Sequence, residues 1–340
     1  MTTAHVPDDQ VIERSMASLY ALVEARNHHL DERTALKDLF AQERTRLTAS
    51  AGASFAMARC VVKALGLHRL FHEVKTVVES DLGELISCLF HQAETFLHRY
   101  RWDEPDPALE VVAAITSLQK ELHVKSHTLH QLPCHPTTAT KRVDLVKQYL
   151  TPTSRFLCLG DDDFLSIGLA LSAPNEITVV DLDPQLITLI EQVAQEQRLR
   201  ITCRVADIRK PLPEHFYSSF DVVITDPIYS VQEMLLFLSV AESCLRRSAS
   251  SYLVSCCSRS LAGRDWRRVE DWAAWRGLMI HTFLPGFNEY PKTARLQKML
   301  MIGERLLFRS AVTRACMGIP FLYSDLVVFR YHRNERGNEL

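Results

Sequence analysis

From residue 143 onward, short apolar runs alternate with stretches of helical periodicity, and this alternation limits the possible folds more than any other feature. The apolar runs are continuous and rich in β-branched residues, which is typical of strands covered on both faces. Strands and helices alternating at this spacing predict a parallel, doubly wound sheet. The predicted strands are RFLCLG (155–160), EITVVD (176–181), RITCRVAD (200–207), FDVVITD (220–226) and SYLVSCCS (251–258).

The first 130 residues show helical periodicity almost throughout. In VIERSMASLYALVEA (11–25), apolar side chains recur at steps of three and four residues and so form one apolar stripe. Pro105 and Pro107 separate the last two predicted helices of this half. We therefore expect an all-helical domain over 1–130, acting in oligomerisation or as a lid, before a catalytic α/β domain over 131–340.

Composition excludes several classes of partner. The chain is 47% hydrophobic and 24% charged, and its formal net charge of −2 gives no electrostatic reason to expect nucleic acid or an anionic membrane. No apolar run reaches transmembrane length, and the first ten residues lack the basic flank and apolar core of a signal peptide. The nine cysteines are scattered, as packed, reduced thiols are. We expect a cytoplasmic protein.

Carboxylates follow four consecutive predicted strands. Ligands of open α/β sheets bind outside the carboxyl ends of the strands, so these side chains should share one rim. Crowded carboxylates raise each other's pKa, and a cationic or hydroxyl-rich ligand explains such a rim better than chance. For any single aspartate, capping a helix is an equally good explanation. The rim comprises Asp161, Asp162, Asp163, Asp181, Asp183, Asp207 and Asp226.

Position in the fold suggests a role for each cofactor-binding candidate. Asp181, after the second strand, is placed to accept hydrogen bonds from ribose hydroxyls, and Asp183 is better placed to cap the next helix. Asp207, after the third strand, can accept from the exocyclic amine of adenine. Gly160 allows close approach of the backbone to the ligand. The Rossmann-like domain is therefore expected to be of the class I methyltransferase and spermidine synthase type.

Three consecutive aspartates after the first strand indicate which donor binds. The carboxylate of S-adenosylmethionine normally lies over this turn, and each close pair of like charges would cost about 1–4 kcal/mol. An ammonium group would instead be favoured. Decarboxylated S-adenosylmethionine, or a polyamine, suits Asp161, Asp162 and Asp163 better.

Five motifs occur in the second half, in the order GDDDFLSIGLAL (160–171), VVDLDPQL (179–186), DIRKPLP (207–213), FDVVITDP (220–227) and GFNEY (286–290). Together they resemble the branched-chain polyamine synthases, the N4-bis(aminopropyl)spermidine synthases of thermophilic archaea and bacteria. The resemblance runs from about Leu132, where QLPCHPTTATKR is similar to the loop before the family's catalytic domain, to about Arg330.

The resemblance implies an aminopropyltransferase of polyamine biosynthesis. Such an enzyme moves an aminopropyl group from decarboxylated S-adenosylmethionine to an amine and releases methylthioadenosine. The family's key carboxylate lies in the GDDD turn, which corresponds to Asp161, Asp162 and Asp163, with the middle residue as the first candidate. An amine that is protonated at neutral pH needs a carboxylate to accept its proton, and Asp226 can share that role from the neighbouring strand end.

One motif departs from the family pattern of two prolines followed by an acid. Here Asp226-Pro227 is followed by Ile228 and Tyr229, so a carboxylate is lost and the motif approaches the [DN]PPY sequence of amino-group methyltransferases. The identity of the acceptor amine is then undetermined, and Tyr229 is expected to pack near it. Asn288, Glu289 and Tyr290 are retained as substrate-binding candidates, although a surface turn after Pro285-Gly286 explains them equally well.

Three functions are therefore in competition. The first is aminopropyl transfer to a small-molecule amine. The second is transfer of a methyl or 3-amino-3-carboxypropyl group from S-adenosylmethionine to such an amine. The third is a catalytically inactive nucleotide-binding module whose helical half binds a protein partner. We also expect a homodimer. No bound metal is expected, because the group His123, His127, His130 and Cys134 lacks a second ligand pair at zinc-finger spacing.

Overall fold

The structure, a computed structural model, forms two compact units. One comprises Met1–Asp103 with Pro291–Tyr323, and the other Glu104–Tyr290 with Ser324–Leu340. The boundary near residue 104 differs from the domain boundary expected at 130, because helix α5 (Leu109–Lys125) belongs to the second unit. The residues described are 14–19, 42, 91–93, 95–96, 108–125, 133–227, 230–258, 265–292, 315 and 318–332.

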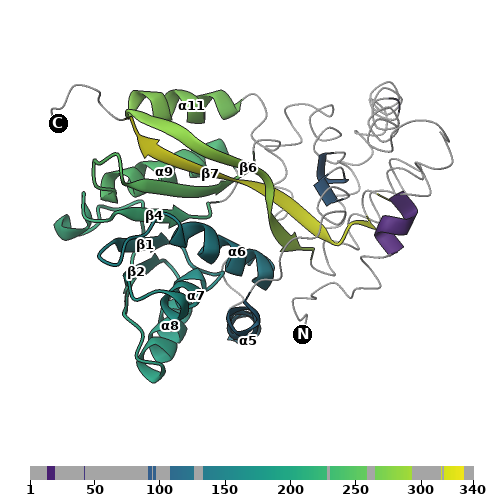
Figure 1. Ribbon diagram of the computed structural model, residues 1–340, viewed down its shortest axis with the longest axis horizontal. Helices are drawn as coiled ribbons and strands as arrows, with labels where there is room; N and C mark the ends of the chain where they lie inside the picture. Colours follow the sequence, from purple (N-terminus) through teal and green to yellow (C-terminus); the bar gives the residue numbers. More distant parts are fainter. Residues whose placement is uncertain are drawn as a thin grey trace, which may run out of the picture. The chain divides into compact units, whose positions relative to one another are not determined.

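The second unit is built on a seven-stranded mixed sheet with the order β3-β2-β1-β4-β5-β7-β6 (Figure 1). The first five strands run parallel, and β7 pairs antiparallel with β5. The predicted doubly wound, mostly parallel sheet is thus confirmed. The strands are β1 (Arg155–Leu159), β2 (Glu176–Asp181), β3 (Ile201–Val205), β4 (Val222–Thr225), β5 (Tyr252–Cys257), β6 (Leu278–Pro291) and β7 (Phe321–Tyr331).

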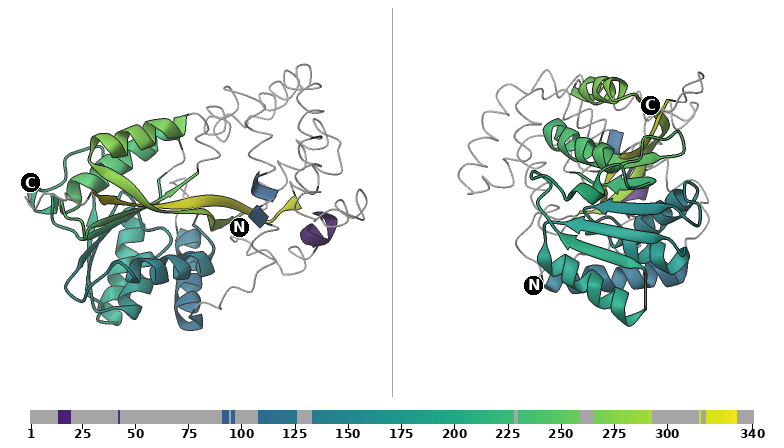
Figure 2. Two further views of the ribbon diagram at one scale, coloured as in Figure 1. Left: turned by 45° about the horizontal axis from the view of Figure 1, so that its top comes forward. Right: turned by 90° about the vertical axis from the view of Figure 1, so that its left-hand side faces the viewer.

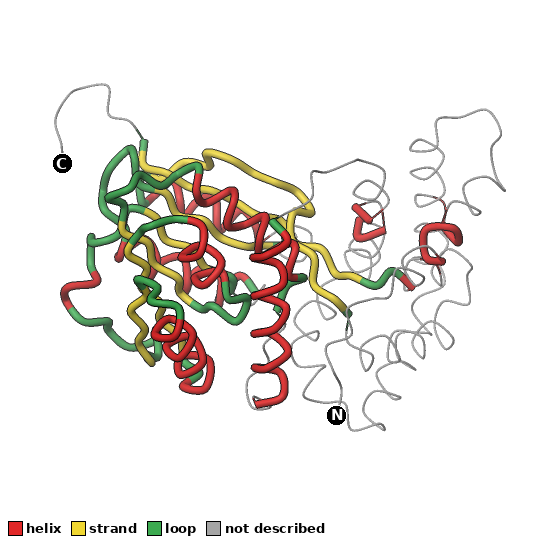
Figure 3. The backbone as a smooth tube through the Cα atoms, turned by 60° about the horizontal axis from the view of Figure 1, so that its bottom comes forward, coloured by secondary structure: helices red, strands yellow, loops and turns green. Residues whose placement is uncertain are grey.

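Helices cover both faces of this sheet (Figures 2 and 3). Helices α7 (Leu165–Ser172) and α8 (Pro184–Glu196) lie with α5 on one face. Helices α9 (Val231–Cys244) and α11 (Trp266–Trp275) lie on the other, and a short 3₁₀ helix, η1 (Glu214–Phe216), precedes β4. With both faces covered, the central parallel strands β1, β4 and β5 are buried, which explains their continuous apolar runs, whereas the edge strand β3 is largely exposed.

Helix α6 (Pro136–Lys147) precedes β1 and packs against α5 and α7. It begins at His135, whose Nδ1 accepts from the backbone N–H of Thr137 at 3.4 Å, with Pro136 in the first turn. Gly168 of α7 permits the close packing, because an added Cβ would lie 3.0 Å from Val143 of α6 and 3.1 Å from Val111 of α5. The helices before β1 are therefore part of the core that supports the sheet.

The first unit joins segments far apart in the sequence. Ser15 Oγ donates to the carbonyl oxygen of Gly318 at 2.8 Å, and Gln92 Nε2 donates to that of Tyr323 at 2.8 Å. Residues 14–19, 91–93 and 95–96 are helical. Most of the predicted N-terminal helices lie outside the described residues, so an all-helical domain there stays a prediction. No helix in the part of the chain that the structure describes is long and apolar enough to cross a membrane.

Candidate active site

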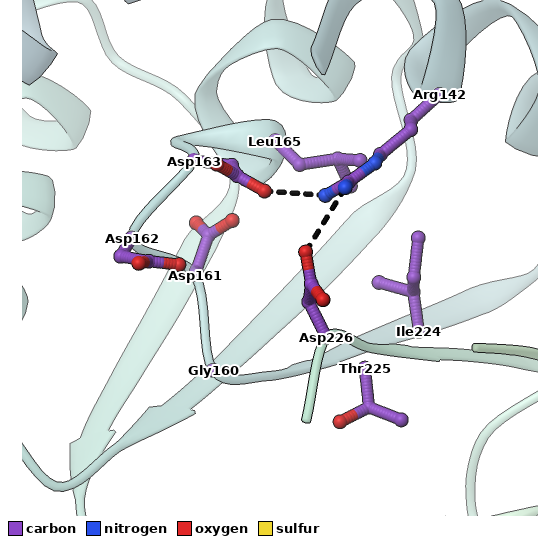
Figure 4. A pocket seen from close by; sticks show the side chains of 9 residues that line it. All are labelled: Arg142, Gly160, Asp161, Asp162, Asp163, Leu165, Ile224, Thr225 and Asp226. Carbon is purple, nitrogen blue, oxygen red and sulfur yellow. Dashed lines mark hydrogen bonds and ion pairs between the residues drawn. The ribbon is translucent and has the colours of Figure 1, made fainter. Parts of the chain in front are cut away.

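A small pocket, partly open to solvent, lies at the carboxyl ends of β1 and β4 (Figure 4). These two strands are neighbours in the sheet although β2 and β3 lie between them in sequence, so this is the point where the strand order reverses. Open α/β sheets bind their ligands at this point. The pocket is lined by Arg142, Gly160, Asp161, Asp162, Asp163, Leu165, Ile224, Thr225 and Asp226.

The turn after β1 places three consecutive aspartates at the pocket. Gly160 has φ +81°, a left-handed conformation that favours glycine, and its N–H donates to the carbonyl oxygen of Val180 in β2 at 2.9 Å. Phe164 closes the turn with φ 56°, uncommon for a bulky residue, and its side chain is fully buried. Both ends of the turn are therefore fixed to the core.

Arg142, which was not predicted as a site residue, binds four other side chains at the pocket. Its side chain is only 2% exposed, and its Nη1 forms an ion pair with Asp163 Oδ2. Its Nη2 donates to Asp226 Oδ2 at 2.9 Å (Figure 4). The same nitrogen donates to the hydroxyl of Tyr290 at 2.7 Å. Its Nε donates to Asn288 Oδ1 at 2.8 Å. Helix α6, the β1 turn, the end of β4 and strand β6 are all joined through this guanidinium.

Asp161 binds to its own turn. Both of its carboxylate oxygens accept from the backbone N–H of Ser166 at 3.3 Å, and the hydroxyl of Ser166 donates to one of them as well. Burial raises the pKa of the Asp161 carboxyl to about 8, against the opposing effect of the Ser166 hydrogen bonds. Asp161 thus lies before α7, whose N-cap is Phe164, and binds Ser166 in the first turn of that helix.

Asp162 is different because it makes no hydrogen bond to any described residue. It lines the pocket with an intermediate exposure, and no contact line reaches it in Figure 4. Burial raises the pKa of its carboxyl well above the ordinary value, and the negative charges of Asp163 and Asp226 raise it further. A carboxylate with a raised pKa and no partner is suited to accept a proton from a ligand.

The cofactor-binding candidates on the neighbouring strands are also held locally. Asp181 Oδ1 accepts from the N–H of Asp183 at 2.8 Å, and its Oδ2 accepts from the N–H of Asp161 at 3.2 Å. Asp183 caps α8 by accepting from the N–H of Gln185 at 2.8 Å, so its predicted capping role is confirmed. Asp207 pairs with Arg209 at 2.8 Å, and this pairing lowers the pKa of Asp207.

The substrate-binding candidates Asn288, Glu289 and Tyr290 lie in β6, so the alternative of a surface turn was wrong. All three are buried. Asn288 Nδ2 donates to Ser324 Oγ at 3.0 Å and to the carbonyl oxygen of Asp325 at 2.9 Å, which fixes the amide that binds Arg142. Tyr290 donates its hydroxyl to Asp226 Oδ2 at 2.6 Å. Tyr229 lies outside the described residues.

The loop before α6 is joined to the same network. The N–H of His135 donates to the carbonyl oxygen of Glu289 at 2.7 Å, and the N–H of Cys134 donates to Asp163 Oδ1. Cys134 and His135 therefore have structural contacts that account for their positions. No cluster of three metal-binding side chains is found among the described residues, and His127 and His130 lie outside them. The absence of a metal stays a prediction.

Comparison with known proteins gives a consistent result. Residues 110–321 match the family model described as the branched-chain polyamine synthase A C-terminal domain. An uncharacterised protein of Methanocaldococcus jannaschii is 33% identical over 165 residues, which cover 48% of this chain and 41% of that protein. The N(4)-bis(aminopropyl)spermidine synthase of Thermococcus kodakarensis is 28% identical over 191 residues, covering 55% of this chain and 54% of that one.

The chain spans at most about half of the length of the curated relatives that it matches. The fold is also similar to a crystal structure of the branched-chain polyamine synthase from Thermus thermophilus in complex with N4-aminopropylspermidine and 5'-methylthioadenosine. The TM-score is 0.54 at 20% identity, covering 69% of this chain and 68% of that one. At this identity the likeness concerns the fold.

Removing the buried cation should destabilise the second unit strongly. We expect Arg142→Met to lower the free energy of unfolding by about 3–5 kcal/mol, because the buried Asp163 and the half-buried Asp226 are left without their partner. Urea denaturation measures the change. In the matched control, Arg200→Met, an exposed pair with Glu176 at 2.7 Å is lost, which should cost less than about 1 kcal/mol. Equal losses in the two variants would contradict a stabilising role for the buried network.

The raised pKa of Asp161 should appear in the pH dependence of stability. Between its unfolded pKa and about 8, the folded protein holds a proton that the unfolded chain has released, so stability falls as the pH rises. Asp161→Asn removes this effect and keeps an oxygen to accept from Ser166. Its stability relative to the wild type should rise by about 1 kcal/mol per pH unit between about pH 5 and 7.

The matched control for that measurement is Asp207→Asn. Asp207 has an acidic pKa in the unfolded chain, and pairing with Arg209 lowers it further in the folded protein, so the difference between Asp207→Asn and the wild type should stay constant over the same range. Parallel curves for the wild type and Asp161→Asn would show that Asp161 is ionised throughout.

Proposed function

The chain belongs to the branched-chain polyamine synthase family, and on that premise we propose that it is an aminopropyltransferase. It would move an aminopropyl group from decarboxylated S-adenosylmethionine to an amine of a polyamine-like acceptor and release methylthioadenosine. The observation that carries the proposal is Asp162, a carboxylate with a raised pKa and no hydrogen bond to any described residue, at the reversal point of the sheet. The names of the matched synthases support it.

The reaction needs a proton acceptor and little else from the side chains. An acceptor ammonium gives one proton to Asp162, and its nitrogen lone pair then attacks the aminopropyl carbon bonded to the sulfonium. The carbon–sulfur bond breaks, its electron pair stays on sulfur, and neutral methylthioadenosine leaves. The new carbon–nitrogen bond leaves the positive charge on the product amine. Orientation of the amine by a fixed carboxylate supplies much of the rate increase in such reactions.

The pocket charges favour the decarboxylated donor. Intact S-adenosylmethionine carries a carboxylate that would meet the aspartates of the β1 turn. Arg142 is the cation of the pocket lining, and its Nε, Nη1 and Nη2 already donate to Asn288, Asp163, Asp226 and Tyr290. It is therefore poorly placed to neutralise a substrate carboxylate. This argues against a 3-amino-3-carboxypropyl transfer, and against a methyl transfer that uses the same intact donor.

The remaining roles follow the positions of the strand ends and stay proposals. Asp181 would accept from ribose hydroxyls with the lone pairs not used by the backbone. Asp207 would accept a hydrogen bond from the adenine amine. To do so it must give up its exposed ion pair with Arg209. Glu289 and Tyr229 would contact the acceptor. A homodimer, a cytoplasmic location and the absence of nucleic-acid or membrane partners also stay predictions.

Product analysis tests the reaction. The protein is incubated with each donor form and a panel of linear polyamines, diamines and monoamines, and the products are measured by mass spectrometry. We expect an added aminopropyl group and methylthioadenosine with the decarboxylated donor only, because of the pocket charges. A methylated or aminocarboxypropylated amine with intact S-adenosylmethionine would support the alternative function. No product with any donor would support a catalytically inactive nucleotide-binding module.

Substitution of Asp162 tests the proposed proton acceptor. We expect Asp162→Asn to lower kcat by about 10²- to 10⁴-fold, because an amide cannot accept the proton of an ammonium. Circular dichroism should show an unchanged fold, since Asp162 makes no hydrogen bond to a described residue. The control Asp271→Asn replaces an exposed carboxylate on α11 and should leave kcat unchanged. Full activity of Asp162→Asn would exclude this residue as the acceptor.

A further inference from the structure

The four acidic side chains of the pocket differ in what their oxygens already bind. Asp161 accepts from Ser166, and Asp163 accepts from Cys134 and Arg142. Asp226 Oδ2 accepts from both Arg142 and Tyr290. Asp162 alone among the four accepts from no described residue. The four carboxylates of the pocket therefore differ in how many of their oxygens remain available to a ligand.

Arg142, which binds Asp163 and Asp226 but not Asp162, is held firmly in place. Arg142 is 2% exposed and lies in the helix α6, which packs against α5 and α7. Its Nε is bound by Asn288, and that amide is itself fixed by Ser324 and by the backbone of Asp325. A buried guanidinium that makes four hydrogen bonds would lose several of them, charge-assisted ones included, if it turned toward a ligand.

We infer that Arg142 is a positioning residue of the transfer reaction. By binding Asp163 and Asp226 it withdraws these two carboxylates from the amine and directs proton acceptance to Asp162. This inference rests on the proposed aminopropyl transfer and changes one part of it, because Asp226 then shares no proton acceptance. The reactive carboxylate is selected by its neighbours, and Tyr290 assists by donating to Asp226.

The charges around Asp162 support the assignment. It faces Asp163 on its own turn, Asp181 at the end of β2, Asp226 at the end of β4 and Arg142 on α6. The three carboxylates raise the pKa of Asp162, and the guanidinium lowers it. Asp226 pairs with Arg142 and makes no hydrogen bond to Asp162, so it acts on Asp162 at a distance, through its charge. Its removal should then change the pH at which Asp162 works.

The test compares Asp226→Asn with Asp162→Asn in steady-state kinetics across pH. An asparagine at 226 keeps one oxygen to accept from Arg142 or Tyr290. We expect kcat of Asp226→Asn to fall by less than about tenfold, against about 10²-fold or more for Asp162→Asn. The acid limb of its pH profile should move to lower pH by about 0.5–1 unit, because one negative charge near Asp162 is lost. A purely structural role would lower the amount of active enzyme without moving the acid limb.

Asp163→Asn provides a second variant. The same small fall in kcat and the same shift of the acid limb are expected for it, and it serves as the test if Asp226→Asn does not fold. Folding is checked by circular dichroism, and donor binding by calorimetry. A folded variant at 226 or 163 as inactive as Asp162→Asn would overturn the inference, as would an unmoved acid limb. Both outcomes leave aminopropyl transfer by the wild-type protein intact. Failure of the proposed function would appear separately, as the absence of an aminopropylated product from the wild-type protein.

Discussion

One buried cation organises the site. The guanidinium of Arg142 joins a helix before the sheet, the turn after β1, the end of β4 and the strand β6. Burying an arginine costs free energy unless carboxylates and hydrogen bonds compensate it, and Asp163, Asp226 and Asn288 do so here. The loop before α6 and the Asn288–Tyr290 segment are far apart in the sequence. The hydrogen bonds of Arg142 and its partners bring these two segments together beside the pocket.

The environment of each aspartate separates roles that the sequence presents as equal. Asp161 and Asp183 bind backbone N–H groups at helix starts, which is the ordinary use of aspartate beside a strand end. Asp163 and Asp226 are partners of Arg142. Asp162 is left with its carboxylate facing the pocket and with neighbours that raise its proton affinity. Of these five groups, two bind helix starts, two are counterions of Arg142, and the fifth, Asp162, is the one that we propose as the proton acceptor.

The sequence predicts the parallel part of the sheet well because buried strands need continuous apolar runs. All five predicted strands agree with β1–β5 to within two residues at each end. Strands β6 and β7 were missed. Pro285 and Gly286 resemble a turn in the sequence, although β6 continues through them. Arg142 was missed for a different reason. A single arginine in a helical pattern is typical of a solvated surface, and its burial depends on partners up to 148 residues away.

The first unit draws on two separated parts of the chain, residues 1–103 and 291–323. The second part connects β6 to β7, so one of the two segments of this unit is an insertion between two neighbouring strands of the sheet. Its apolar residues Ile319 and Phe321 are buried, and Gln92 binds the backbone of Tyr323. Exchange of residues 1–103 by recombination at one position would separate these partners. Evolution of this segment is therefore expected to be coupled to that of the β6–β7 connection, with compensating changes in both.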